Sequence, residues 1–159
     1  MIRNISENTI YHIYNRGSSK MIIYISNGDY QRFIKKLDLY SEKYRISILN
    51  YCLMPNHFHF MINVEEKDCT SDILKKSKSQ RISSFMRDLQ NAYAKYFNLK
   101  YTHSGHVFQG AYRLKPVLDD SYLEALIIYI NNNPVRKGLV KKAEEWPYSC
   151  LSIDLANNG

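Results

Sequence analysis

The sequence predicts an α+β fold whose centre is a four-stranded antiparallel sheet. Extended runs with alternating side chains and segments with helical periodicity follow one another in the order strand, helix, strand, strand, helix, strand, helix. The 159 residues are enough to bury one hydrophobic core, and no internal repeat divides them. We therefore expect a single domain over residues 1–159, with its core at about residues 11–150.

The first half of the chain supplies two strands and a helix. Residues 11–15 (Tyr-His-Ile-Tyr-Asn) form the first expected strand, and Gly17 allows the chain to turn after it. Residues 29–44 are expected to be a helix, because apolar side chains recur there at helical spacing. Residues 46–53 are rich in β-branched and aromatic side chains and predict the second strand.

A hairpin follows, and it presents a pair of histidines. The turn Pro55-Asn56 leads into a third strand over residues 57–64. Successive side chains of a strand point to opposite faces, so His57 and His59 share one face, while the phenylalanine after each of them points into the core. Neutral imidazole is a common metal ligand, although two histidines fall short of the usual protein ligand set of a zinc site. The pair is therefore either one part of a metal site or a chance feature of a half-buried strand.

The middle of the chain is predicted to contain a loop, a helix and an extended segment. Residues 65–80 are polar and weakly periodic, and we expect a mobile loop there. A helix is predicted over residues 82–97, where large apolar side chains lie four apart on one face. Residues 107–118 are predicted to be extended, with Arg113 and Lys115 on the same alternating face.

A last helix is predicted from the capping box Ser121-x-x-Glu124 to Pro134, which stops it. Tyr129 and Asn133 lie four residues apart on this helix and so share a face. Taken alone, Tyr129 fits a packing role and Asn133 fits a helix end. The complete order of elements is the split βαβ pattern, so we expect a ferredoxin-like or RRM-like fold with helices on one face of the sheet.

The composition favours a polyanionic partner. The net charge is +7 and the isoelectric point is about 9.2. The 14 tyrosines supply rings that can stack on unpaired bases while basic side chains follow the phosphates. No apolar run approaches the length of a membrane span, and the N-terminus lacks the profile of a signal peptide. Three widely spaced cysteines form no disulfide framework, which suits a reducing cytoplasm.

Two motifs together resemble a known family. Residues 54–59 (Met-Pro-Asn-His-Phe-His) and 129–135 (Tyr-Ile-Asn-Asn-Asn-Pro-Val) are similar to the single-tyrosine HUH transposases of bacterial insertion sequences, the IS200-like group. The resemblance is closer to the branch associated with repeated extragenic palindromes (REP). Residues 11–17, 105–110 and 146–149 support it, so that it covers nearly the whole chain.

The resemblance implies a chemistry and assigns residues to it. It makes His57 and His59 metal ligands and Tyr129, on a C-terminal catalytic helix, the nucleophile that cuts single-stranded DNA through a covalent 5′-phosphotyrosine. Asn133 stands where better-known relatives have a glutamine as third ligand, and its shorter side chain must bring helix and strand closer together. The family implies magnesium or manganese as the cofactor.

The resemblance also implies partners. We expect single-stranded DNA that forms hairpins, no membrane partner, a possible homodimer, and a location in the bacterial cytoplasm at the nucleoid. A basic track beside the active site is expected to contact the DNA. Its predicted members are Asn15, Arg16, Arg87, Arg113, Lys115, Arg136 and Lys137.

Two other functions fit parts of the sequence. One is a histidine-based metal hydrolase, in which water replaces Tyr129 as the nucleophile, although no glutamate adjoins the histidines to act as its general base. The other is a catalytically inactive nucleic-acid-binding module, since the same sheet topology serves RNA recognition domains. That module leaves the histidine pair unexplained.

Overall fold

The computed structural model describes residues 9–152, so the predicted domain extends beyond the described part at both ends. Its four strands form one antiparallel sheet in the order β2-β3-β1-β4, which confirms the expected fold class. The elements are β1 (Ile10–Arg16), α1 (Asn27–Tyr44), β2 (Ile46–Met54), β3 (His57–Val64), α2 (Lys78–Tyr101), β4 (Arg113–Val117), α3 (Asp120–Asn131) and α4 (Asn133–Arg136), with short 3-10 turns at Ser18–Lys20 and Ala143–Glu145.

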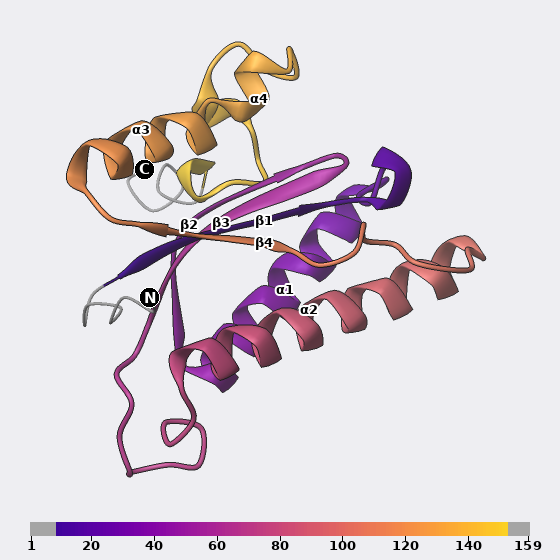
Figure 1. The fold of residues 1–159 in the computed structure, drawn as a ribbon. Coiled ribbons are helices and arrows are strands. Elements are labelled where there is room, and N and C mark those ends of the chain that lie inside the picture. Colours follow the sequence, from indigo (N-terminus) through magenta and orange to yellow (C-terminus); the bar gives the residue numbers. More distant parts are fainter. Residues whose placement is uncertain (1–8, 153–159) are drawn as a thin grey trace.

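Helices cover both faces of the sheet. Figure 1 shows α1 and α2 on one side and α3 with α4 on the other. The main core lies on the side of α1 and α2, where Phe33, Phe58, Phe60, Phe85 and Tyr93 are fully buried. Burial of apolar surface is the dominant favourable term in folding, and these aromatic rings contribute large areas to it. No helix within residues 9–152 combines the length and hydropathy needed to cross a bilayer.

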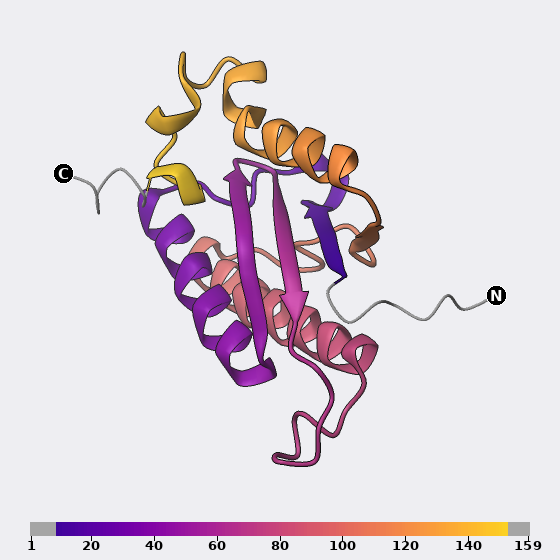
Figure 2. The ribbon, with the colours of Figure 1, turned by 90° about the vertical axis from the view of Figure 1, so that its left-hand side faces the viewer.

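A smaller apolar cluster attaches α3 to the opposite face. Leu126 and Ile130 of α3 pack on Cys52, Met54 and Met61 of β2 and β3. This helix is the expected C-terminal catalytic helix, and it lies on the face of the sheet opposite α1 and α2. In Figure 2 the loop over residues 65–77 extends from the end of the sheet farthest from α4.

Two element boundaries differ from the sequence-based expectation. Helix α2 begins at Lys78, earlier than expected, because Ser77 and Gln80 form a reciprocal capping box. Strand β4 covers only the last part of the extended segment expected over residues 107–118. Gly110 has φ +59°, a left-handed conformation that interrupts an extended chain.

The last helix also differs from its prediction. Its N-cap is Asp119, whose carboxylate accepts a hydrogen bond from the backbone N–H of Tyr122 at 2.7 Å, so the expected box starting at Ser121 is wrong. The helix ends at Asn131, and Pro134 lies in the first turn of the separate short helix α4. Proline is tolerated there because the first N–H groups of a helix have no intrahelical acceptor.

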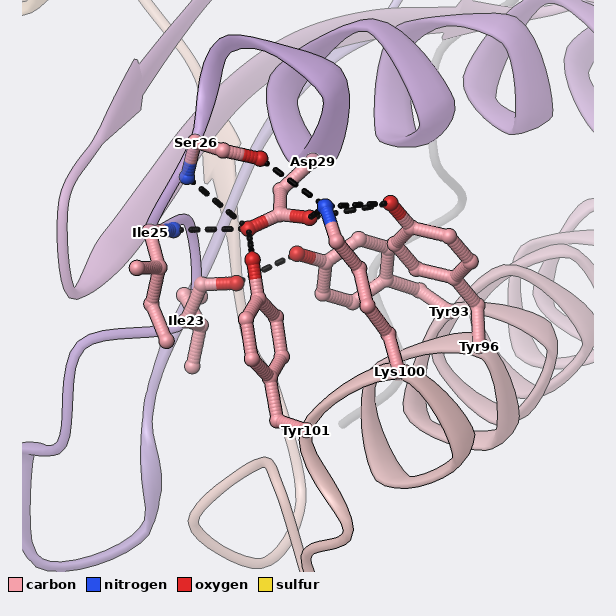
Figure 3. A network of polar contacts seen from close by, with 8 residues as sticks. All are labelled: Ile23, Ile25, Ser26, Asp29, Tyr93, Tyr96, Lys100 and Tyr101. Carbon is pink, nitrogen blue, oxygen red and sulfur yellow. Dashed lines mark hydrogen bonds and ion pairs between the residues drawn. The ribbon is translucent and has the colours of Figure 1, made fainter.

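One buried carboxylate organises the segment between β1 and α1. Asp29 lies in the first turn of α1 and its side chain is fully buried. The carboxylate accepts hydrogen bonds from two backbone N–H groups and from three side chains of α2, as Figure 3 shows. The donors are Ile25 N, Ser26 N, Tyr96 Oη, Lys100 Nζ and Tyr101 Oη. Although burial opposes ionisation, these bonds hold the pKa of Asp29 well below its usual range.

The same network reaches the turn that precedes His57. The hydroxyl of Tyr93 donates to the backbone oxygen of Ile23. The backbone N–H groups of Ile23 and Tyr24 in turn donate to the carbonyl of Pro55, at 2.8 and 3.2 Å. The segment tied down by Asp29 therefore also fixes the hairpin turn.

Asp29→Asn is expected to lower the melting temperature by about 10 °C, which corresponds to about 3 kcal/mol for a chain of this size. The amide cannot accept all the bonds that the carboxylate accepts, and it leaves Lys100 without its ion pair. Thermal unfolding at pH 7 measures the change. Asp38→Asn, which alters an exposed carboxylate on the same helix, is the matched control and should shift melting little. Equal shifts for the two variants would contradict this role of Asp29.

Candidate active site

The two motif histidines lie side by side on a central strand. His57 and His59 belong to β3, which pairs with β2 on one side and β1 on the other. Their side chains face α3 and α4, and their ring centroids are 5.2 Å apart with the rings nearly perpendicular. His57 is half-buried, whereas His59 is only 6% exposed. The prediction that the two side chains share one face of the strand is confirmed.

Each of these histidines has a hydrogen-bond partner on Nδ1. Nδ1 of His57 lies 2.7 Å from the side-chain oxygen of Asn56, which can only accept, so His57 carries its proton there and keeps a lone pair on Nε2. Nδ1 of His59 lies 3.0 Å from Nε2 of His12. When His12 accepts in that bond, His59 likewise has its lone pair on Nε2. Such partners on Nδ1 are typical of metal-binding histidines, because they set the tautomer and the ring orientation.

Burial lowers the pKa of all three imidazoles. The pKa of His57 falls to about 4 through burial and the nearby charge of Lys137. The pKa of His59 falls to about 3 through burial, with His57, His12 and Arg136 adding to the effect. Burial also lowers the pKa of His12 to about 4. All three rings are therefore neutral at physiological pH, and neutral imidazole is the form that binds metal ions.

Asn133 lies beside the histidine pair. Its side chain is 2% exposed, and its amide nitrogen lies 3.3 Å from Nε2 of His57. Rotation of the amide by half a turn places its oxygen in the same position. Asn133 thus reaches the site from α4, not from the helix of Tyr129 as the sequence predicts.

The donor set fits a divalent ion that needs further ligands. Two imidazoles and one amide are available, and the space in front of them leaves room for phosphate oxygens or water. Within residues 9–152 no three histidine, cysteine, aspartate or glutamate side chains gather as a metal site. The protein would therefore supply an incomplete ligand set, which suits an ion that also contacts a substrate.

Tyr129 lies next to His59, on the helix that covers this face of the sheet. It lies on α3, and its ring stands perpendicular to that of His59 with 5.6 Å between centroids. The guanidinium of Arg136 lies 4.1 Å from the centroid of the Tyr129 ring and donates to the backbone oxygen of Tyr129 at 3.0 Å. The tyrosine remains 46% exposed, so its hydroxyl is open to a bound molecule.

The other two tyrosines considered from the sequence are placed differently. Tyr112 packs against the main core, on the other face of the sheet, and burial raises its pKa. Tyr122 lies in the first turn of α3, two helical turns before Tyr129. Of these three tyrosines, only Tyr129 contacts a motif histidine.

A cleft of about 600 Å³ opens in front of this group and is lined by basic side chains. Most of the predicted basic track lies in it, together with Lys20, which the sequence analysis missed. The basic residues of the cleft are Arg16, Lys20, Arg113, Arg136 and Lys137. Lys115 lines an adjoining hollow. It is two residues after Arg113 on β4, so the two side chains point to the same face of the sheet, as the sequence predicts.

Two predicted members of the track differ from the others in their surroundings. Arg87 lies on α2, on the far side of the sheet, where it pairs with Asp88 at 3.1 Å. Asn15 borders the cleft, but its amide group donates to Gln90 and to the carbonyl of Gly110, and its oxygen accepts from the backbone N–H of the next residue. The Arg87 assignment is therefore wrong, because that side chain is on the far face of the sheet. The DNA contact of Asn15 stays a prediction, since this residue lines the cleft while its amide already has partners within the protein.

His12 and Tyr14 are site residues that the sequence analysis missed. They alternate on β1, and Tyr14 pairs in register with His59. The two rings stack at 4.9 Å, and the His12 ring also stacks on His59 at 5.2 Å. The alternation within residues 11–15 indicates that His12 and Tyr14 share a face of their strand. That this face adjoins His59 follows from the strand order, in which β1 lies next to β3.

Comparison with known proteins places the chain in a family. The profile of the family described as "Transposase IS200 like" matches residues 5–133, most of the chain. The chain belongs to the IS200-like transposase family. This confirms the family suggested by the two sequence motifs.

A curated relative supports that family assignment. It is 30% identical over 118 residues to the "Putative REP-associated tyrosine transposase" of Haemophilus influenzae. The match covers 72% of this chain and 64% of the length of that relative.

Solved structures show a similar fold. A REP-associated tyrosine transposase bound to a REP hairpin superposes with a TM-score of 0.68 and 18% identity, over 96% of this chain and 81% of the other. A crystal structure titled as a putative transposase from Deinococcus radiodurans R1 has a TM-score of 0.53 and 13% identity, over 83% of this chain and 95% of the other.

Proposed function

We propose that the protein is a metal-dependent single-strand DNA endonuclease and strand transferase, which acts through a covalent 5′-phosphotyrosine at Tyr129. The observation that carries this proposal is the meeting of Tyr129 with His57 and His59 beside a cationic cleft. The reaction would serve DNA transposition or the processing of REP-like hairpins, in line with the family and with a neighbour whose structure contains a REP hairpin. A homodimer and a nucleoid location remain predictions.

In the proposed reaction, the 5′ end of the cut DNA is bonded to the tyrosine in a covalent intermediate. The Tyr129 hydroxyl attacks the phosphorus, the bond from phosphorus to the 3′ oxygen breaks, and that oxygen takes a proton and leaves as a 3′-hydroxyl. The 5′ phosphate stays bonded to the tyrosine. Since the phenol pKa is about 10, phenolate leaves far more readily than an alkoxide. A second 3′-hydroxyl can therefore displace the tyrosine and rejoin DNA without ATP.

The surrounding residues prepare this attack. His57 and His59 would hold Mg²⁺ or Mn²⁺ with Asn133 as third ligand, and the ion would supply positive charge against the scissile phosphate. Arg136 restrains Tyr129 through two contacts: its guanidinium lies over the Tyr129 ring, and it donates a hydrogen bond to the backbone oxygen of Tyr129. His12, on the neighbouring strand β1, orients the His59 ring through the contact between its Nε2 and Nδ1 of His59.

The position of α3 weighs against the RNA-recognition alternative. Modules of that type bind bases on an open sheet face. Here α3 packs on the corresponding face through Leu126 and Ile130. That helix places Tyr129 over the histidines instead.

A labelled-DNA assay tests the proposed function. The full chain is incubated with a pool of DNA hairpins that have randomised single-stranded flanks, with Mg²⁺ or Mn²⁺, and then denatured. We expect an adduct that carries a 3′-end label but not a 5′-end label, because the 5′ phosphate of the downstream strand is the group bonded to tyrosine. Cleavage without an adduct would favour the hydrolase, and binding without cleavage would favour the inactive binding module.

Binding of Mn²⁺ is expected to persist at pH 5.5. The pKa values of about 4 for His57 and about 3 for His59 leave both rings neutral at that pH. Two histidines with the ordinary pKa of about 6.5 would each be about 90% protonated, and affinity would fall by about 100-fold. The dissociation constant, measured from the EPR signal of free Mn²⁺ at pH 7.5 and 5.5, should change by less than about threefold. A loss of affinity centred near pH 6.5 contradicts this prediction.

Affinity for single-stranded DNA is expected to fall steeply with salt. Each phosphate contact on a single strand contributes about −0.7 to the slope of log K against log salt concentration. Arg113→Ala should weaken binding and make the slope shallower by about 0.7, because Arg113 lines the cleft. Arg87→Ala is the matched control on the far face and should change neither quantity. The cleft assignment fails if Arg87→Ala has the larger effect.

A further inference from the structure

A second hollow of about 410 Å³ lies beside the cleft, between α3 and the sheet. Tyr14, His59 and Tyr129 line both hollows, so Tyr129 stands at the boundary between them. The proposed cleavage reaction uses the cleft and leaves the second hollow without a role. Figure 1 shows α3 lying over the sheet.

The two hollows differ in charge. The cleft has five lysine or arginine side chains, namely Arg16, Lys20, Arg113, Arg136 and Lys137. Among the described residues, Lys115 alone supplies such a charge to the second hollow, and its Nζ lies 5.6 Å from the centroid of the Tyr14 ring. A phosphate backbone is therefore attracted to the cleft, whereas the second hollow suits a less charged part of the nucleotide.

The walls of the second hollow are aromatic and aliphatic. Tyr122, Ala125, Leu126 and Tyr129 line it from α3, at spacings that put them on one face of the helix. Ala125 has no side chain beyond Cβ, which leaves space between the two tyrosines. Tyr122 is 38% exposed, and its ring contacts no other aromatic ring within residues 9–152. Flat apolar walls with a free aromatic ring are the surface on which a nucleobase stacks.

We propose that this second hollow binds one unpaired nucleobase, that of the nucleotide next to the scissile phosphate, stacked on Tyr122. The proposal rests on the proposed function, because attack by Tyr129 places the scissile phosphate at the boundary of the two hollows. The phosphate then remains beside the cationic cleft while the adjoining base enters the apolar side. The hollow would thereby favour cleavage at a phosphate whose neighbouring base is unpaired. This selection would be separate from recognition of a hairpin stem.

Binding without chemistry provides the first test. A DNA hairpin with single-stranded flanks is labelled with 2-aminopurine at one flank position at a time and titrated with the full chain in the absence of divalent metal. Stacking quenches 2-aminopurine, so we expect strong quenching at one position. Tyr122→Ala should remove that quenching and weaken binding by about 5- to 150-fold, the range for loss of one stacked base. Tyr122→Phe keeps the ring and should restore both.

Ile128→Ala provides the matched control, since Ile128 is exposed on α3 and does not line either hollow. It should behave as the wild type, and thermal unfolding should show all variants to be folded. The proposal is overturned if the DNA binds and no flank position changes its fluorescence between wild type and Tyr122→Ala. It is also overturned if Ile128→Ala produces the same loss.

Adduct formation with an abasic nucleotide separates this proposal from the proposed function. An abasic site at the quenched position should lower the rate of adduct formation by the wild type. Tyr122→Ala should lower the rate on unmodified DNA by the same factor, and combining the two changes should add no further loss. Independent, multiplicative losses would contradict the base pocket even though the adduct forms. Loss of the adduct from every substrate, with quenching at Tyr122 intact, would refute the proposed function and leave the base-binding hollow in place.

Discussion

Replacing Tyr129 by phenylalanine is expected to reduce the covalent protein–DNA adduct to the detection limit, a loss of about 10⁴-fold or more for a missing nucleophile. The change removes one oxygen from a side chain that is 46% exposed, so packing of α3 should hardly change. The ring also keeps its contacts with His59 and Arg136. Binding of the same DNA should therefore persist within about threefold, which a fluorescence titration measures.

Two tyrosine variants are controls for that loss. Tyr112→Phe changes a ring packed against the main core, and Tyr122→Phe changes one in the first turn of α3. Both should still form the adduct. If Tyr129→Phe forms the adduct and either control does not, the nucleophile has been assigned to the wrong residue. Cutting without an adduct by all three variants would favour water as the nucleophile.

Removing either motif histidine is expected to have the second-largest effect. His59→Ala should raise the Mn²⁺ concentration required for half-maximal adduct formation by about 100-fold, because it deletes one of the two imidazoles proposed as metal ligands. His57→Ala should act similarly, and excess Mn²⁺ should partly restore the reaction in both. A metal titration of adduct yield measures this shift.

His106→Ala is the control for the histidine variants. His106 is exposed in the loop after α2 and does not line the cleft. Its replacement should leave the metal dependence unchanged. If the His57 and His59 variants share the wild-type metal requirement, the two rings do not bind the ion.

The strands of the site were predictable from local patterns. Alternation and the Pro55-Asn56 turn predict a strand over residues 57–64, and β3 has those bounds. The prediction succeeds because one face of this strand is buried under phenylalanines, which leaves a single possible register. The Ser77-x-x-Gln80 box also marked the start of α2, but the lysine-rich sequence around it obscured that signal.

The remaining features of the site depend on tertiary structure. Asp119 and Ser121 are both good N-cap residues, and the entry of the chain from β4 decides between them. The bond between His12 and His59 joins residues far apart in the sequence and requires the strand order. Likewise, no local pattern shows that Arg87 faces away from the cleft, since solvated arginines look alike in a sequence.

Mapping the DNA-linked residue tests whether Tyr129 is the nucleophile. The adduct is digested with nuclease and trypsin, and the peptides are sequenced by mass spectrometry. Trypsin does not cleave between Lys115 and Pro116, so one peptide, residues 114–136, contains both Tyr122 and Tyr129, and fragmentation distinguishes them. We expect a nucleotide phosphate on Tyr129. A nucleotide on Tyr122, on a tyrosine outside this peptide, or on no tyrosine while the DNA is cut would contradict it.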